Sequence, residues 1–177
     1  MKPIDLPKMV SIRKRSKKVM KTNKKTLGKS IEERPEYIND RSEFGHWEID
    51  LVLGKKTKSE AVMLTLVERQ TRYALGVKLE DKQSQTINRA VTHLISQCPI
   101  ASITADNGSE FSLLSDLEAV DVYFAHPYSS HEIGTNGNFN GLLREYVPKG
   151  VSLNPLTSEE LDNDITAINE RPRRLLQ

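Results

Sequence analysis

The 177-residue sequence has little cysteine and no long apolar run. Its single cysteine, Cys98, excludes an internal disulfide and a cysteine-rich zinc site. No apolar segment approaches the roughly 20 residues that a membrane-spanning helix needs. The basic N-terminus lacks the apolar stretch of a secretory signal. With 37% hydrophobic and 28% charged residues, the chain is expected to form one cytoplasmic globular domain without a membrane partner.

Positive charge is concentrated at one end of the chain. Residues 1–30 carry eleven Lys and Arg against one acid, Asp5, whereas the other 147 residues carry 15 basic and 23 acidic side chains. Such a basic arm can neutralise the phosphates of a nucleic acid without reading its sequence. The alternative is a solvated tail beside a domain boundary. Because its few apolar residues lack helical spacing, we expect the arm to be disordered until it binds. Contacts with DNA are expected from Lys14, Arg15, Lys17 and Lys18.

The rest of the chain divides by its hydrophobic periodicity. Residues 31–44 are acidic, contain a proline and are interpreted as a linker, and the folded domain is expected over 45–177. Alternating or continuous apolar residues predict five strands, and a period of 3.6 residues predicts helices. The expected strands are 46–53, 61–67, 72–79, 100–105 and 122–125; the expected helices are 84–98, 113–119, a segment ending near 146, and one starting at 157. A flexible loop is expected over 128–136. Three antiparallel strands followed by strand–helix alternation predict an α/β fold, with a mixed five-stranded sheet and helices on both faces.

The first expected strand has one polar and one apolar face. His46, Glu48 and Asp50 alternate on one side, and Trp47 is on the other. Trp47 is interpreted as a core anchor rather than a base-stacking platform, and His46 as a structural residue rather than a metal neighbour.

Two aspartates are candidates for a metal site. Asp50 lies within the first strand, and Asp106 closes the fourth strand immediately before a turn. If these strands are neighbours, the two carboxylates converge and repel each other unless a cation neutralises them. Mg²⁺ prefers oxygen ligands and usually takes one or two carboxylates, and a pair of such ions suits phosphodiester displacement. The alternative places Asp50 in solvent on an edge strand, with Asp106 only opening an Asx-turn.

Seven segments of the chain carry a family resemblance: GHWEIDLVLGKK (45–56), LTLVERQTRY (64–73), ITADNGSEF (103–111), VYFAHPYSS (122–130), GTN (134–136), NGLLREYVPKG (140–150) and INERPRR (168–174). Together they resemble the catalytic core of IS30-family transposases. That resemblance implies an RNase H-like integrase fold with a DDE active site, which cleaves and joins DNA in the presence of Mg²⁺ (Mn²⁺ is an alternative). Asp50 and Asp106 match the first two acids. The implied partners are transposon ends, target DNA and further copies of the chain on DNA, in association with a bacterial nucleoid.

The third acidic position departs from the family pattern. Where the family motif reads GTNEN, this sequence has Gly137, which offers no ligand oxygen. Glu145 lies about 12 Å further along a helix, Glu132 lies in the expected loop, and Glu48 is at best a neighbour of the site. DNA joining is therefore expected to be severely impaired. The chain also stops at Gln177 where family members usually continue, so the core is expected to be truncated.

Further DNA contacts are expected around this site. Asn107 matches the family motif, and Lys55 and Lys56 form a basic turn. The residues Asn136, Asn140 and Arg144 recur at intervals of four and would share one helix face, where Arg and Asn commonly contact phosphates. The alternative is a solvated helix face. His126 and His131 are interpreted as ordinary loop residues.

Three functions remain open at this stage. The first is a transposase core with residual, metal-dependent nicking activity. The second is a non-catalytic remnant that binds DNA or oligomerises, with the basic arm supplying affinity. The third is a ribonuclease H, which has a similar fold. Nicking of supercoiled DNA separates the first two, and cleavage of an RNA–DNA hybrid identifies the third.

Overall fold

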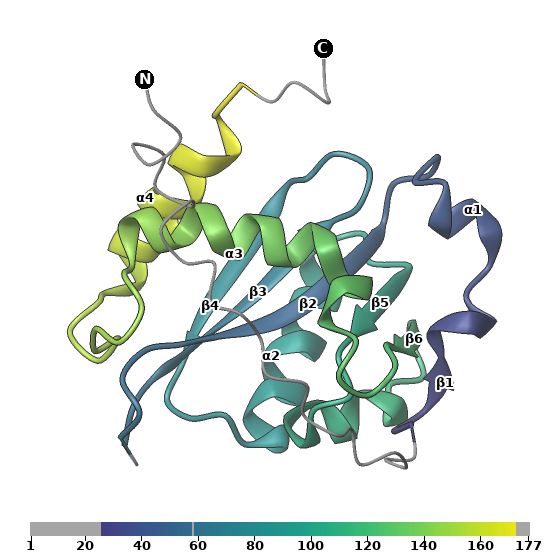
Figure 1. Ribbon diagram of the computed structural model, residues 1–177, viewed down its shortest axis with the longest axis horizontal. Helices are drawn as coiled ribbons and strands as arrows, with labels where there is room; N and C mark the ends of the chain where they lie inside the picture. Colours follow the sequence, from purple (N-terminus) through teal and green to yellow (C-terminus); the bar gives the residue numbers. More distant parts are fainter. Residues whose placement is uncertain (1–25, 58, 173–177) are drawn as a thin grey trace, which may run out of the picture.

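A six-stranded mixed sheet forms the centre of the computed structural model, which describes residues 26–57 and 59–172 (Figure 1). The strand order is β1-β6-β5-β2-β3-β4. The strands are β1 (Lys29–Ser30), β2 (His46–Leu53), β3 (Val62–Glu68), β4 (Ala74–Leu79), β5 (Ser102–Ala105) and β6 (Asp121–Phe124). The α-helices are α1 (Glu36–Asn39), α2 (Ser84–Gln97), α3 (Gly134–Tyr146) and α4 (Ser158–Asn169), and the 3-10 helices are η3 (Ile31–Glu33), η4 (Ser109–Asp116) and η5 (Ser130–Ile133).

The sheet changes direction at β2. Strands β2, β3 and β4 form the antiparallel meander that the sequence predicts, and β2 pairs with β5 in parallel, as does β5 with β6. All five expected strands are present. A sixth, β1, was not predicted, because its two residues are too short to show any periodicity; it pairs in parallel with β6. The prediction of five strands is therefore corrected to six.

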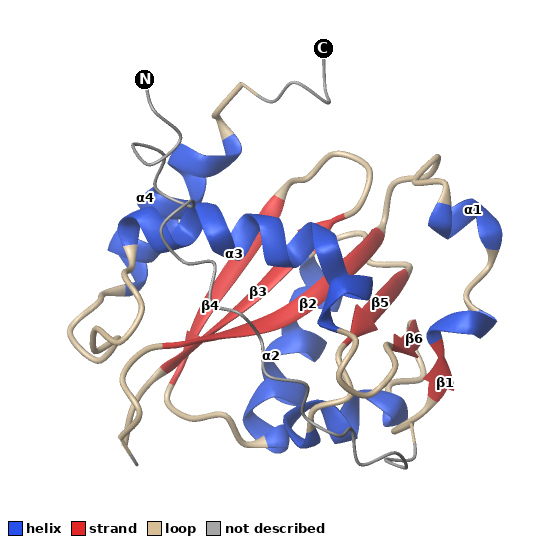
Figure 2. Cartoon of the chain, in the orientation of Figure 1, coloured by secondary structure: helices blue, strands red, loops and turns tan. Residues whose placement is uncertain are grey.

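Helices cover both faces of the sheet, as expected, and each face has its own core (Figure 2). On one face α2 and η4 bury Ile87, Val91 and Phe111 against the sheet, together with Trp47 from β2. On the other face α3 and α4 bury Phe139, Leu143, Leu161 and Ile165. Helix α4 starts with a capping box, in which the side chains of Thr157 and Glu160 satisfy each other's backbone N–H groups. The polar and apolar alternation along β2 thus faces two different helical layers.

Residues 31–44 are not a free linker. They contain η3 and α1, and Ile38 is only 1% exposed. Arg34 donates from Nη1 to the Thr104 hydroxyl at 3.0 Å, which fastens the segment to β5. The expected arm is also shorter than predicted, since Lys29 and Ser30 belong to the sheet. Lys14, Arg15, Lys17 and Lys18 lie outside the described residues, and their DNA contacts stay a prediction.

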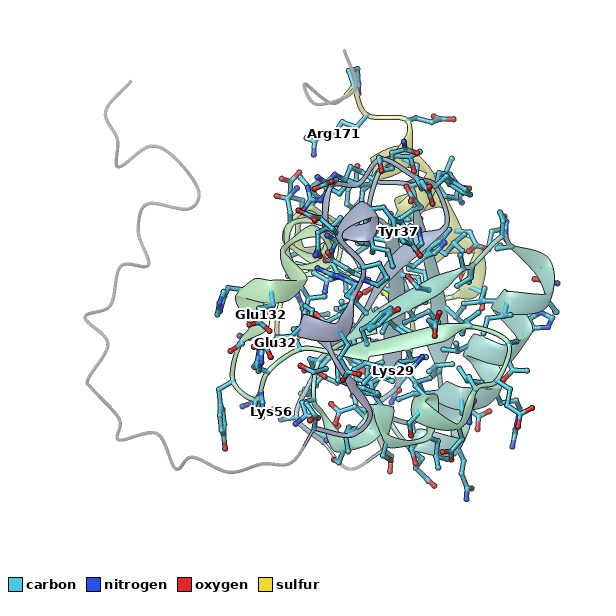
Figure 3. The ribbon with its side chains drawn as sticks, turned by 90° about the vertical axis from the view of Figure 1, so that its right-hand side faces the viewer. Lys29, Glu32, Tyr37, Lys56, Glu132 and Arg171 are labelled. Atoms are coloured by element: carbon cyan, nitrogen blue, oxygen red, sulfur yellow. The ribbon has the colours of Figure 1, made fainter. Side chains whose placement is uncertain are left out.

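The segment expected to be a flexible loop is partly helical. Helix η5 occupies residues 130–133, and α3 already begins at Gly134. His126 lies between two carboxylates: its Nδ1 is 2.9 Å from Glu132, and its Nε2 is 3.3 Å from Glu32. Figure 3 shows these two acids side by side, one from η3 and one from η5. Local hydrogen bonding therefore orders a segment that lacks apolar periodicity.

Within residues 26–57 and 59–172, no helix combines the length and the apolar character that crossing a membrane requires.

Candidate active site

The two candidate aspartates come from neighbouring strands. Strands β2 and β5 are parallel, and Glu48 pairs with Thr104. Asp50 and Asp106 each follow two residues later, so they lie on the same side of the sheet where β5 ends. Strand β2 is central rather than an edge strand, which contradicts the alternative interpretation of Asp50. Asp106 does open an Asx-turn, because its Oδ1 accepts a hydrogen bond from Gly108 N at 3.0 Å.

The surroundings of the pair raise the pKa of both carboxyl groups. Burial raises the pKa of Asp50 to about 6; the charges of Asp106 and Glu110 add to this rise, and hydrogen bonds from Leu51 and Asn140 oppose it. Burial also raises the pKa of Asp106, with a further contribution from Glu110. An added cation would relieve both burdens, because it favours the ionised form of each carboxylate.

Glu110 is a third acid in this region that the sequence reasoning missed. A Cβ on Gly108 would lie 2.8 Å from the Glu110 carboxylate and 2.9 Å from the Asp106 carboxylate. A larger residue at 108 would therefore push one of these side chains aside, and the turn brings the two negative charges together. The available signal was the spacing of Asp106 and Glu110, two acids four residues apart with Gly108 between them.

Asp50 is held by hydrogen bonds at both carboxylate oxygens. Its Oδ1 accepts from the backbone N of Leu51 at 2.8 Å, and its Oδ2 accepts from Nδ2 of Asn140 at 2.8 Å. Arg144 lies one turn further along α3. Burial lowers the pKa of its guanidinium, and the negative charge of Asp50 partly offsets this effect. Helix α3 thus contributes both a hydrogen-bond donor and a positive charge to the Asp50 side of the site.

Asn136 lies in the protein interior rather than on a DNA-binding face. It is fully buried, and its Nδ2 donates to the backbone oxygens of Glu48 and Thr65 at 2.9 and 3.0 Å. The Thr65 hydroxyl donates to its Oδ1 at 3.0 Å. The prediction of a DNA contact for Asn136 is wrong, and so is the alternative of a solvated face. Spacing shows which residues share a helix face but not whether that face meets the sheet.

The buried carboxylate of Glu48 fastens the start of α3. It accepts a hydrogen bond from the backbone N of Asn136 at 2.9 Å and pairs with the guanidinium of Arg69. The carboxylate therefore takes up an unpaired N–H group of the helix N-terminus, and the arginine balances its charge. Glu48 is engaged in this role and does not replace the missing third acid.

Gly137 stands in the open on α3. It is exposed, and an added Cβ would meet no atom within 4 Å. It lies three residues before Asn140, so a side chain at 137 would share the helix face that reaches Asp50. The other acids considered as substitutes have partners: Glu132 binds His126 and Glu145 pairs with Arg171 at 3.3 Å. The structure thus has space for a carboxylate at position 137, and in the described part of the chain neither Glu132 nor Glu145 is free to fill it.

The remaining predicted DNA contacts are spread over a turn, a loop and helix α3. Lys55 and Lys56 are exposed in the turn after β2, where Figure 3 labels Lys56. Asn107 uses its Oδ1 to accept a hydrogen bond from the backbone N of Leu27 at 3.0 Å. Arg144 donates from Nη2 to the carbonyl of Leu53 at 2.9 Å. For these residues DNA binding stays a prediction.

Two residues of β2 have the structural roles that were expected. Trp47 is 2% exposed and donates its indole N–H to the Pro99 carbonyl. His46 is buried, contacts the Ser102 hydroxyl through Nδ1 at 2.8 Å, and has its pKa lowered mainly by burial.

The donor set suits a divalent cation held by two protein ligands. Among the residues that the structure describes, no group of three or more His, Cys, Asp or Glu side chains is arranged to hold a metal ion. Asp50 and Asp106 offer only oxygen atoms, and Mg²⁺ commonly binds one or two carboxylates while keeping several waters. The residues present therefore fit a hydrated magnesium or manganese ion rather than a closed protein cage.

The fold is that of the RNase H-like integrase catalytic cores. The catalytic core domain of BIV integrase superimposes with a TM-score of 0.54 at 14% sequence identity, over 73% of this chain and 86% of that one. The sequence agrees, because the integrase core domain family matches residues 40–130. The chain belongs to the integrase core domain family.

Curated relatives of the chain are transposases. A probable transposase for the insertion-like sequence element IS1161 from Streptococcus salivarius is 62% identical over 174 residues, which are 98% of this chain and 51% of that protein. The transposase InsI for insertion sequence element IS30A from Escherichia coli (strain K12) is 40% identical over 156 residues, 85% of this chain and 40% of that protein. The chain thus spans about half the length of the relatives it matches.

Proposed function

We propose that this domain breaks and joins DNA phosphodiester bonds as the catalytic core of an IS30-type transposase. The observation that carries the proposal is the convergence of Asp50 and Asp106 from parallel neighbouring strands in an integrase core fold. The two carboxylates would hold Mg²⁺ or Mn²⁺. When bound, such ions activate an attacking oxygen and stabilise a leaving one.

The protein's own residues would prepare this site in three ways. Asp50 and Asp106 would supply oxygen ligands on one face of the sheet where β5 ends, and burial keeps bulk water from screening them. Arg144 supplies a positive charge on the α3 side. Lys55 and Lys56 would hold the phosphate backbone, since exposed lysines bind phosphates without sequence preference.

We further propose that Gly137 impairs the reaction. The test is a supercoiled-plasmid nicking assay with Mg²⁺ and with Mn²⁺, comparing the natural chain with Gly137→Glu. The expected result is weak or absent nicking by the natural chain and a gain of at least tenfold in the variant, which Asp106→Asn removes. Gly134→Glu is the matched control, because Gly134 is equally exposed on α3 with no atom within 4 Å of an added Cβ; it should gain nothing.

The lost acid at position 137 also favours a second candidate, a non-catalytic remnant that binds DNA or oligomerises. DNA binding without nicking, in the natural chain and in Gly137→Glu alike, would support the remnant and contradict a core that one substitution restores. Strong nicking by the natural chain, abolished by Asp106→Asn, would contradict the proposed impairment. Cleavage of an RNA–DNA hybrid in preference to duplex DNA would indicate a ribonuclease H instead.

The proposed partners are transposon ends, target DNA and further copies of the chain. Support for assembly comes from a structural neighbour, a chain in the simian T-cell lymphotropic virus intasome in complex with PP2A regulatory subunit B56 gamma, which matches with a TM-score of 0.51 at 18% identity over 70% of this chain and 46% of that one. Cross-linking with and without duplex DNA would test assembly, and a labelled chain in bacterial cells would test nucleoid association.

A further inference from the structure

Asn140 has a more specific role in the structure than contact with a phosphate. Its Nδ2 donates to Asp50 Oδ2 at 2.8 Å, while its Oδ1 lies 3.1 Å from the Thr65 hydroxyl. The opposite orientation of the amide would set its oxygen against an ionised carboxylate, which accepts hydrogen bonds but cannot donate them. The charge of Asp50 therefore fixes which way Asn140 points.

Thr65 forms a rigid base for this amide. It is fully buried on β3, and its hydroxyl lies within 3.2 Å of three acceptors: the Asp50 carbonyl, Asn136 Oδ1 and Asn140 Oδ1. The hydroxyl has one proton, so these acceptors share it. Asn136 is fully buried and donates its own Nδ2 to two backbone carbonyls. The side chains of Asn136 and Thr65 therefore cannot easily change orientation.

The two hydrogen bonds on Asp50 define the plane of its carboxylate. Leu51 N occupies one position at Oδ1, and Asn140 Nδ2 occupies one at Oδ2. An ionised carboxylate has about four lone-pair sites, so each oxygen keeps capacity for a cation. Without the Asn140 bond, Oδ2 would lose its hydrogen bond from a side chain and the carboxylate could rotate about χ2, a broad torsion.

We infer that Asn140 is a positioning residue, which together with Thr65 orients the Asp50 carboxylate for a divalent cation. The inference rests on the proposed function, because it takes Asp50 as a metal ligand. It replaces the predicted role of Asn140 as a DNA phosphate contact. Because Gly137 supplies no carboxylate, metal affinity depends more strongly on the orientation of the ligands that remain than it would in a site with a ligand at position 137.

The test is Mn²⁺ affinity of the whole chain, measured by electron paramagnetic resonance at one fixed pH. Replacing a residue that orients a metal ligand typically costs about 10- to 100-fold in metal affinity, so Asn140→Ala is expected to lose at least tenfold. Asn138→Ala is the matched control, since Asn138 is the same residue type, exposed on the same helix; its Mn²⁺ affinity should be unchanged. Asp50→Asn, which removes the proposed ligand itself, should lower the Mn²⁺ affinity at least as much as Asn140→Ala does.

A second pair of variants separates orientation from loss of fold. Thr65→Val keeps the shape of the side chain and removes the hydroxyl, and Thr65→Ser keeps the hydroxyl. Reduced Mn²⁺ affinity in Thr65→Val, retained affinity in Thr65→Ser, and an unchanged DNA affinity of Asn140→Ala in EDTA are the expected results.

The outcomes distinguish the inference from the proposed function. If Asp50→Asn lowers Mn²⁺ affinity but Asn140→Ala does not, the positioning role is overturned and the metal site stands. If Asn140→Ala weakens DNA binding in EDTA and leaves Mn²⁺ affinity intact, Asn140 is a phosphate contact and the inference is wrong. If the natural chain binds no Mn²⁺ through Asp50, both proposals are overturned.

Discussion

At the scale of single residues, Asp50 illustrates the conflict between stability and chemistry. Burial and two neighbouring acids disfavour its charge, while two hydrogen bonds support it. To hold the proposed metal ion, Asp50 would nevertheless have to be ionised. The site therefore holds a carboxylate whose charged form is costly to the folded protein until a cation arrives.

This conflict predicts a pH-dependent stability. The pKa of Asp50 is raised from 3.8 to about 6 in the folded state. The stability that the protonated carboxyl group contributes to the folded protein is therefore fully present below pH 3.8 and is lost as the pH rises through about 6. Without metal, Asp50→Asn should remove this loss and be more stable than the natural chain above pH 7, by at most about 3 kcal/mol. Urea unfolding at pH 4.5 and pH 8 measures the effect.

Two controls bear on this result. Asp162→Asn, exposed on α4, should leave the pH profile of the natural chain in place. Mn²⁺ should reduce or abolish the loss of stability in the natural chain, because a bound cation favours the ionised carboxylate and so lowers the folded-state pKa of Asp50. Parallel pH profiles for Asp50→Asn and the natural chain would contradict the raised pKa.

Sequence patterns located the main acids but not their supporting residues. Asp50 and Asp106 were recognisable because each interrupts or closes an apolar strand. Thr65 and Glu48 are polar residues in predicted strands, and their polarity was a usable signal. Their partners on α3 could not be deduced, because periodicity does not reveal which helix crosses which strand.

At the scale of elements, α3 is tied to the sheet by polar groups as well as by its apolar face. Glu48 binds the N-terminal turn of the helix, and Arg69 neutralises it in the interior. Phe139 and Leu143 supply the apolar contact. Helix α3 is therefore held firmly against the sheet, even though Gly137 on this helix has no side chain that could bind a metal ion.

Removing the carboxylate of Glu48 should destabilise the fold strongly. Glu48→Ala leaves the buried Arg69 charge and the start of α3 without a partner, and such losses cost about 3–5 kcal/mol. Glu145→Ala, which removes an exposed ion pair with Arg171, should cost less than about 1 kcal/mol. Urea denaturation compares the two. Equal small effects would show that the Glu48–Arg69 pair does not fasten α3.

The packing of α4 on β4 depends on a glycine. A Cβ on Gly76 would lie 2.2 Å from Cδ1 of Ile165, so Gly76→Ala should cost about 1–3 kcal/mol by overpacking. Ile165→Val removes that Cδ1 atom, and the double variant should cost less than the sum of the single ones. Gly134→Ala, with open space at its Cβ, should not destabilise. Additive costs for Gly76 and Ile165 in thermal unfolding would contradict the contact.

The elements also show where sequence reasoning reaches its limit. The long periodic segments, β2 to β4, α2 and the capped α4, were predicted within a few residues. The short β1 was missed and 31–44 was misread as a linker, because these segments owe their structure to β5 and β6 rather than to their own pattern. Distant partners help to hold them in place, together with the local capping box of Ser30 and Glu33 at the start of η3.

At the scale of the whole molecule, charge separates the arm from the folded body. Residues 1–25 contain ten Lys and Arg and one acid. An arm deletion should therefore end at residue 25, because a deletion to residue 30 would also remove β1 from the sheet.

Deleting residues 1–25 should weaken duplex DNA binding and flatten its salt dependence. Each phosphate that a basic residue neutralises adds about 0.9 to the slope of log affinity against log salt, so loss of several contacts should lower the slope by several units. Fluorescence anisotropy between 50 and 300 mM salt measures it. A Lys55→Ala, Lys56→Ala double variant should lower the slope by at most about 2. An unchanged slope after the deletion would contradict a DNA-binding role for the arm.

The hydrogen bond from Leu27 to Asn107 also has a topological consequence. It anchors Leu27, near the first described residue, next to Asp106, which immediately precedes Asn107 in the sequence. Thr26, the first residue that the structure describes, is therefore covalently joined to a residue anchored beside Asp106. If the proposed function holds, a DNA-cleaving probe coupled through a cysteine introduced at Thr26 should cut bound DNA close to Asp106, and breaking the Leu27 anchor by Asn107→Ala should spread those cuts over more positions.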